Sequence, residues 1–250
     1  MFQIGFFRSK EMFLTFFEFY LNNKKFSNNP STNWGLNFNT IFLNYSSEKK
    51  YFTRFFNIPS DSKTRFITSG NVLADSCLNK SKIKSRNINN NKILFISQPL
   101  HSWVGFPKTS YIEFIELLKK KLESRQFDLV VRLHPNDDNY FKEHLKNSGI
   151  EISNNKNYSD DLYSYNRFIG VCSAAMLAPI KIKLPTLSIT LKDVPSFADI
   201  DGFKNYLQYS IDDLDMAIDS LLDLKISNYD EIFHMPASKI IIDNVKNFLR

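Results

Sequence analysis

Three short segments carry side chains that can bind a negatively charged group. They are Gln98–Pro99, Arg132–Pro135 and Cys172–Ala174. The imidazole of His134 and the hydroxyl of Ser173 are hydrogen-bond donors that suit a phosphate oxygen. The free N–H groups at the start of a helix also attract anions. These residue types together predict a phosphate-binding site.

Each of the two main candidates also has a purely structural interpretation. His134 precedes a proline, which holds its backbone extended and lets the imidazole project from a strand end. The alternative is that the ring only caps the sheet edge by bonding local backbone. Ser173 follows an apolar run, where a strand turns into a helix. It is either an anion ligand or a plain helix-capping serine, and the two roles are compatible.

The surrounding pattern predicts the elements that position these residues. Apolar runs alternate with segments of helical periodicity, which indicates a parallel sheet with helices on both faces. Ligands bind such sheets at the carboxyl ends of the strands, where all three segments fall. Capping-box spacings start two of the helices, at Ser110 and Ser210. The expected strands are 93–97, 127–133, 150–153, 167–172 and 186–191; the expected helices are 110–125, 140–146, 160–165, one from Ser173, one after Ser210 and one from Pro236 to Leu249.

A polar run divides the chain into two parts. Residues 79–92 are rich in Asn, Lys and Ser and lack periodicity, as expected of an exposed linker. We therefore predict a small aromatic-rich N-terminal region, 1–85, and a Rossmann-like domain, 86–250. In the first region, 10–21 has helical spacing, and 38–45 and 65–69 suit short strands.

Composition excludes several function classes. The net charge is +6, but no basic stripe or nucleic-acid-binding motif accompanies it. The 7 glycines form neither G-x-G-x-x-G nor a P-loop, and the 2 cysteines have no zinc spacing. No apolar stretch is long enough for a membrane span, and no signal peptide is evident. We expect a cytoplasmic protein with reduced thiols that binds no nucleic acid.

Two other chemistries are weaker interpretations. The D-x-D triplets at 199–201 and 213–215 resemble metal–nucleotide ligands, but the first suits a loop and the second suits the acidic first turn of a helix. A hydrolase triad of Ser173, His134 and Asp137 would need a nucleophile elbow, G-x-S-x-G, which the sequence lacks. We expect neither a metal nor a cofactor.

The segments KILFISQPL, RLHPND and GVCSAAMLAPIKIKLPTLSI resemble the bacterial sialyltransferases of glycosyltransferase family 52 and the polysialyltransferase type. The resemblance covers about residues 92–192. In that group a Gln-Pro turn, a basic-x-His-Pro motif and a Ser-Ser/Thr motif occur in this order. The resemblance implies a glycosyltransferase-B architecture. Kdo and glycerol-phosphate transferases share similar His-Pro and Ser features.

The resemblance also implies roles for individual residues. His134 is the catalytic residue, contacting the donor phosphate and offsetting charge on the departing nucleotide. Ser173 binds the same phosphate with Ala174 beside it, and Pro135 shapes the turn. Arg132 occupies the basic position of the motif, where a structural role is equally compatible, and Gln98 belongs to the Gln-Pro turn.

The implied function is inverting, metal-independent transfer of a sugar, first sialic acid from CMP-sialic acid, to a cell-surface glycan such as lipooligosaccharide or capsule. The protein would act at the cytoplasmic face of the inner membrane. The sequence departs from the pattern of this group in three ways. It has one hydroxyl in place of the Ser-Ser/Thr pair, Asn136–Asp137 in place of the usual Arg-Glu after His-Pro, and a shorter N-terminal region. The catalytic base is therefore unassigned, and the alternative is a non-catalytic nucleotide-binding or partner subunit.

Overall fold

The computed structural model describes residues 40–43, 49, 65–68, 91–171, 173–194, 206–225, 239–240 and 243. The chain divides into two compact units: Met1–Val72 with Met235–Arg250, and Leu73–His234. The predicted helix 10–21 and most of the predicted linker 79–92 lie outside the described residues, as does the predicted boundary at 85/86.

The first unit contains a short parallel pair of strands. These are β1 (Thr40–Leu43) and β2 (Arg65–Thr68), with Thr40 opposite Arg65 and Leu43 opposite Thr68. Both fall within the predicted strands 38–45 and 65–69. Of the predicted helix from Pro236, only residues 239–240 and 243 are described, and they are helical.

The second unit is built on a six-stranded parallel sheet. The strand order is β5-β4-β3-β6-β7-β8. The apolar runs form strands because both faces of the central strands are covered, so that Ile93, Leu94 and Phe95 have no exposed surface. The predicted α/β class with a parallel sheet is confirmed. The strands are β3 (Lys92–Ile96), β4 (Asp128–Arg132), β5 (Glu151–Ile152), β6 (Phe168–Gly170), β7 (Thr186–Thr190) and β8 (Tyr206–Ser210).

The strand order contains a reversal at the centre of the sheet. The chain starts at β3, moves through β4 to β5 on one side, and returns to β6 on the other side of β3. This is the order of a doubly wound fold, in which ligands bind outside the carboxyl ends of the strands at the reversal point. The loops that follow β3 and β6 therefore mark the expected crevice.

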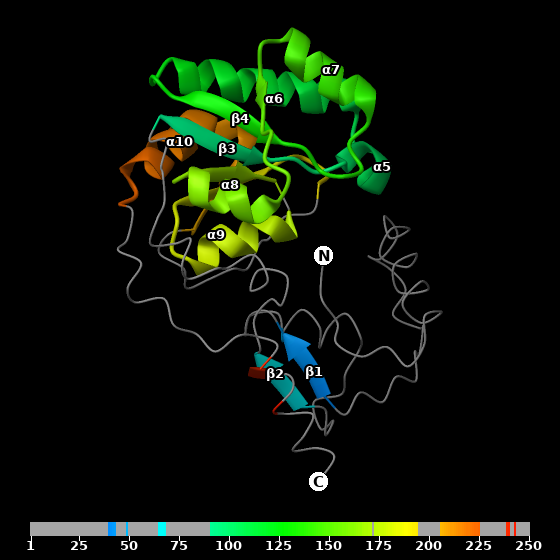
Figure 1. Cartoon of the computed structure of the whole chain (residues 1–250), viewed down its shortest axis with the longest axis vertical. Coiled ribbons are helices and arrows are strands. Elements are labelled where there is room, and N and C mark those ends of the chain that lie inside the picture. The colour runs from blue at the N-terminus through cyan, green and yellow to red at the C-terminus, as the bar shows by residue number, and fades with distance from the viewer. Residues whose placement is uncertain are drawn as a thin grey trace. The chain divides into compact units, whose positions relative to one another are not determined.

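Helices cover both faces of the sheet (Figure 1). One face packs against apolar side chains of α5, α6, α7 and α10, and Phe95, Val131 and Ile169 lie side by side in this core. The opposite face carries α8 and α9. The bounds are α5 (Leu100–Val104), α6 (Lys108–Glu123), α7 (Asn139–Asn147), α8 (Tyr158–Ser164), α9 (Leu177–Lys181) and α10 (Leu214–Asp223). None of the described helices is long and apolar enough to cross a membrane.

The structure corrects three expectations about the elements. First, α6 begins at Lys108 without a side-chain cap, so the capping box at Ser110 is wrong. Second, Ser210 does cap, but it accepts from the N–H of Asp212 and opens a 3₁₀ turn, Ile211–Asp213, before α10. Third, β8 and α5 were not expected, because β8 is a half-buried strand without a continuous apolar run and α5 is a single short turn.

Candidate phosphate site at the carboxyl edge of the sheet

The predicted site residues follow three adjacent parallel strands. Ile96 of β3 lies between Arg132 of β4 and Gly170 of β6. Gln98 comes two residues after Ile96, and His134 comes two residues after Arg132. Ser173 comes three residues after Gly170. Neighbouring strands lie about 4.8 Å apart, so β4 and β6 are separated by roughly 10 Å. The prediction that His134 and Ser173 lie at one edge is confirmed.

His134 opens a tight turn that fixes its ring. The N–H of Asp137 donates to the His134 carbonyl at 2.9 Å, with Pro135 at the second turn position, where its fixed φ is favourable. The N–H of Asn136 donates to His134 Nδ1 at 3.1 Å. A nitrogen that accepts a hydrogen bond carries no proton, so this contact places the proton of the neutral ring on Nε2. Burial lowers the pKa of His134, against a smaller opposing effect of Asp137.

Asp137 anchors this turn to the end of β3. Its Oδ2 accepts from the His134 backbone N–H at 2.7 Å, and the Ser97 hydroxyl donates to the same carboxylate. Burial raises the pKa of Asp137, although these hydrogen bonds oppose the effect. Because His134 Nδ1 accepts from Asn136 and Asp137 bonds the backbone, the geometry is not that of a hydrolase triad. We infer a positioning role for Asp137 in place of the role in a triad.

Gln98 is buried at the reversal point. Its backbone N–H donates to the Tyr111 hydroxyl at 3.2 Å, and the residue is 2% exposed. Its side-chain oxygen has no hydrogen-bond partner among the described residues. An unsatisfied buried oxygen costs about 1–3 kcal/mol, so a donor that reached it would stabilise this end of β3.

Ser173 lies in a tight turn after β6. Its hydroxyl oxygen accepts from the Ala175 N–H at 3.2 Å, and its carbonyl accepts from Met176 at 3.0 Å. The side chain is buried, and a hydroxyl that accepts one bond still has its proton to donate. Gly170 leaves room for the Met176 side chain, since a Cβ there would lie 2.6 Å from Met176 Sδ.

The helix expected from Ser173 takes a different form. A 3₁₀ turn, Ala174–Met176, comes first, and α9 begins only at Leu177 and has 5 residues. The macrodipole depends on many aligned peptides, so a helix this short contributes little positive potential at Ser173. Local N–H groups and the hydroxyl are the donors that remain, and Ala174 is the first residue of the turn.

Arg132 points away from the edge crevice toward α8. Its guanidinium donates to the carbonyls of Asn155 and Lys156 and forms an ion pair with Asp161 at 3.0 Å. Asp161 is fully buried and also accepts from Ser153 at 2.5 Å and Asn155 at 2.8 Å. Burial raises the pKa of Asp161, although its donors oppose that shift. The geometry gives Arg132 the structural role, and its phosphate role stays a prediction.

Helix α8 connects the two turns. Asp161 holds Arg132, two residues before His134, and Tyr158 on the same helix donates its hydroxyl to the Ala175 carbonyl at 2.6 Å. Ala175 in turn donates to Ser173. Neither Asp161 nor Tyr158 was predicted, because their partners lie 29 and 17 residues away in sequence.

The remaining acidic motifs have structural surroundings. Asp215, of the triplet 213–215, lies on α10 and is paired with Lys121 and Arg125 of the α6 end. The triplet 199–201 lies outside the described residues. In the described part of the chain, no three His, Cys, Asp or Glu side chains are grouped as metal ligands would be.

Solved structures with a similar fold include the UDP-GlcNAc 2-epimerase of Methanocaldococcus jannaschii in complex with UDP-GlcNAc and UDP. The TM-score is 0.56 and the identity 15%, with 84% of this chain and 61% of that chain covered. For a second structure of this epimerase, the TM-score is 0.52 and the identity 15%, with 84% of this chain and 62% of that chain covered. For the glycosyltransferase SnogD from Streptomyces nogalater, the TM-score is 0.40 and the identity 10%, with 79% of this chain and 60% of that chain covered.

These similarities concern architecture. No protein-family model matches the sequence, and no curated protein matches it. The chain spans about three-fifths of the length of the two epimerase structures. At 15% identity the likeness shows the fold alone, and that fold is the glycosyltransferase-B architecture expected from the sequence motifs.

Proposed function

We propose that this protein binds a nucleotide-activated sugar at the carboxyl edge of its sheet and transfers the sugar to an acceptor. One observation carries the proposal: Gln98, His134 and Ser173 follow three adjacent parallel strands at the reversal point of a doubly wound sheet. In such folds this is where nucleotide ligands bind. The solved structures with a similar fold, one of them bound to UDP-GlcNAc and UDP, support a nucleotide-sugar ligand.

In the proposed reaction, the acceptor hydroxyl attacks the anomeric carbon while the bond from that carbon to the phosphate oxygen breaks. The pair of electrons leaves with the phosphate, and charge grows on the leaving nucleotide. The Nε2–H of His134 and the hydroxyl of Ser173 donate hydrogen bonds to that charge, which lowers the barrier. No metal is needed in this scheme, because these donors take its place.

The acceptor proton needs a base, which we place in the N-terminal region. A carboxylate there would take the proton from the acceptor hydroxyl. The candidates for this base, Glu48, Asp61 and Asp75, lie outside the described residues. The second candidate function is a non-catalytic nucleotide-binding or partner subunit.

For the donor we propose CMP-sialic acid, and for the acceptor a cell-surface glycan such as lipooligosaccharide or capsule. The short His-Pro and Ser segments support this choice over a UDP-sugar, and Kdo or glycerol-phosphate transfer is the related alternative. We further propose that the protein works in the cytoplasm and associates peripherally with the inner membrane.

A thermal-shift panel tests the proposal. A ligand that binds only the folded protein raises the melting temperature by mass action. We expect CMP at millimolar concentration to raise it more than CDP, UDP or GDP. A larger shift with UDP would replace sialic acid with a UDP-sugar donor, and no shift with any nucleotide would overturn nucleotide binding. Turnover of CMP-sialic acid to CMP then separates an enzyme from a binding subunit.

A further inference from the structure

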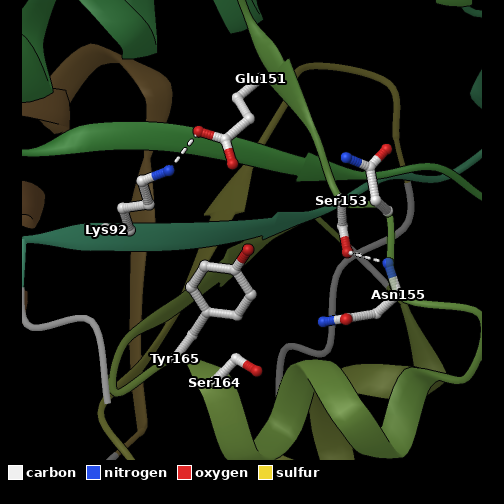
Figure 2. A pocket seen from close by; sticks show the side chains of 7 residues that line it. Lys92, Glu151, Ser153, Asn155, Ser164 and Tyr165 are labelled. Atoms are coloured by element: carbon white, nitrogen blue, oxygen red, sulfur yellow. Dashed lines mark hydrogen bonds and ion pairs between the residues drawn. The ribbon is translucent and has the colours of Figure 1, made fainter. Parts of the chain in front are cut away.

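A polar cavity lies in the second unit beside the short edge strand β5. Its volume is about 290 Å³, and all seven lining side chains are polar. The ion-paired residues Lys92 and Glu151 come from the first positions of β3 and β5, whereas Asn154 and Asn155 follow β5. Figure 2 shows Tyr165 in the middle of this group, with its hydroxyl directed toward the strands.

The cavity has no net charge. Lys92 and Glu151 form an ion pair across it, drawn as a dashed line in Figure 2, and so cancel one another. Burial raises the pKa of Tyr165 to about 12, with Asp161 and Glu151 adding to the effect, so the phenol stays neutral at every physiological pH. A phosphate or another anion gains no uncompensated positive partner here, and a cation gains no uncompensated negative one.

The lining groups are suited to hydroxyl groups of a ligand. Amide and hydroxyl side chains both donate and accept hydrogen bonds, as a sugar hydroxyl does. Those nearest the protein interior are held in place: Ser153 donates to the buried Asp161 at 2.5 Å, and Asn155 donates to it at 2.8 Å. Their remaining acceptor atoms are thus oriented in advance, whereas Asn154 is exposed at the rim.

Size and composition narrow the ligand further. Small-molecule sites range from about 300 to 1,000 Å³, and this cavity is at the lower end of that range, a size that suits one sugar ring. Aliphatic side chains are absent from the lining, which gives a lipid or an apolar ligand nothing to bury.

We infer that this cavity is a second ligand site, which binds one neutral sugar unit, such as a residue of a glycan, separately from the nucleotide crevice. The lining that carries the inference is Lys92, Glu151, Ser153, Asn154, Asn155 and Tyr165. The inference goes beyond the proposed transfer reaction and does not depend on it.

Three sugars that share one ring but differ in charge test the inference: glucose, glucosamine and glucuronate. Ligand-observed NMR titration of the full chain should give a millimolar dissociation constant for glucose and values several-fold weaker for the two charged sugars. Asn154→Ala should weaken glucose binding about fivefold, the effect of losing one hydrogen bond. Asn139→Ala, an exposed asparagine on α7, is the matched control and should change nothing.

A substitution that changes the charge of the cavity is a second and more specific test. Glu151→Gln leaves Lys92 without its carboxylate partner, so the cavity becomes cationic, and the preference should move from glucose to glucuronate. Equal binding of all three sugars, no change in Asn154→Ala, or no binding at tens of millimolar would overturn the inference. Saturating CMP should leave glucose binding unchanged. Competition would instead make the cavity part of the nucleotide crevice, a result that overturns the second site while supporting nucleotide binding.

Discussion

The turn after β4 and the turn after β6 lie at the same sheet edge but are held in different ways. Asp137 and Ser97 bind the first turn to the neighbouring strand, and Asn136 fixes the His134 ring. The second turn is held by the Ser173 hydroxyl itself and, from outside, by Tyr158. The comparison indicates that other residues hold the His134 ring in place, whereas the Ser173 hydroxyl itself helps to hold its own turn.

The largest expected effect is that of removing the preorganised donor. His134→Ala should lower turnover about 10²–10³-fold, by analogy with the loss of one oxyanion donor, while the fold survives because the residue ends a strand. Ser173→Ala should cost less, since the backbone N–H groups of its turn remain. Steady-state kinetics with circular dichroism checks both variants. If Ser173→Ala abolished activity and His134→Ala did not, the comparison would be reversed.

The next effect concerns the support of His134. Asp137→Ala leaves the His134 N–H and the Ser97 hydroxyl without their acceptor, which should cost about 1–3 kcal/mol of unfolding free energy and reduce turnover as well. The control is the adjacent Asp138→Ala. Asp138 caps α7 by accepting from Phe141, so its loss should cost about 1 kcal/mol without changing turnover. Urea unfolding and kinetics measure both; equal losses of turnover would refute the positioning role.

A smaller effect should follow from loosening the second turn. Tyr158→Phe removes only the hydroxyl that donates to Ala175 and should weaken nucleotide binding about fivefold, corresponding to ~1 kcal/mol. Isothermal titration with CMP measures it. Tyr140→Phe is the control, because Tyr140 is 57% exposed. Unchanged affinity in Tyr158→Phe would mean that α8 does not support the Ser173 turn.

The smallest effect is a pH dependence of stability. Burial places the pKa of His134 below its usual value near 6.5, so the neutral ring is favoured in the folded state. This contribution is present above the unfolded pKa and is lost as the pH falls through the lowered folded value. Protonation would also break the bond from Asn136 to Nδ1. The unfolding free energy of wild type should therefore drop more between pH 7 and about pH 5 than that of His134→Gln. Equal losses of unfolding free energy in the two proteins between these pH values, measured by urea unfolding, would contradict this prediction.

Much of the second unit was readable from its sequence. A buried parallel strand needs a continuous apolar run, which Ile93–Ile96 provides, and Arg167–Cys172 likewise predicted β6. The edge strand β8 was missed, because its half-buried residues have no such run. The helix expected from Ser173 shortened to a 3₁₀ turn, and Met176 packs directly over Gly170 there. That contact depends on the sheet, not on local propensity.

The sequence by itself determined the alternation of strands and helices, because local periodicity decides which segments form each. It also determined that Gln98, His134 and Ser173 lie at one edge, because strands connected through helices run parallel and end on the same side of the sheet. Only the tertiary structure decided what surrounds them. Asp161 binds Arg132 and directs it away from the crevice, and Tyr158 donates its hydroxyl to the Ala175 carbonyl. Such pairings depend on which side chains the packed helices bring within about 3 Å of each other. The spacing of residues in the sequence does not predict these hydrogen bonds, because the partners are far apart in the chain.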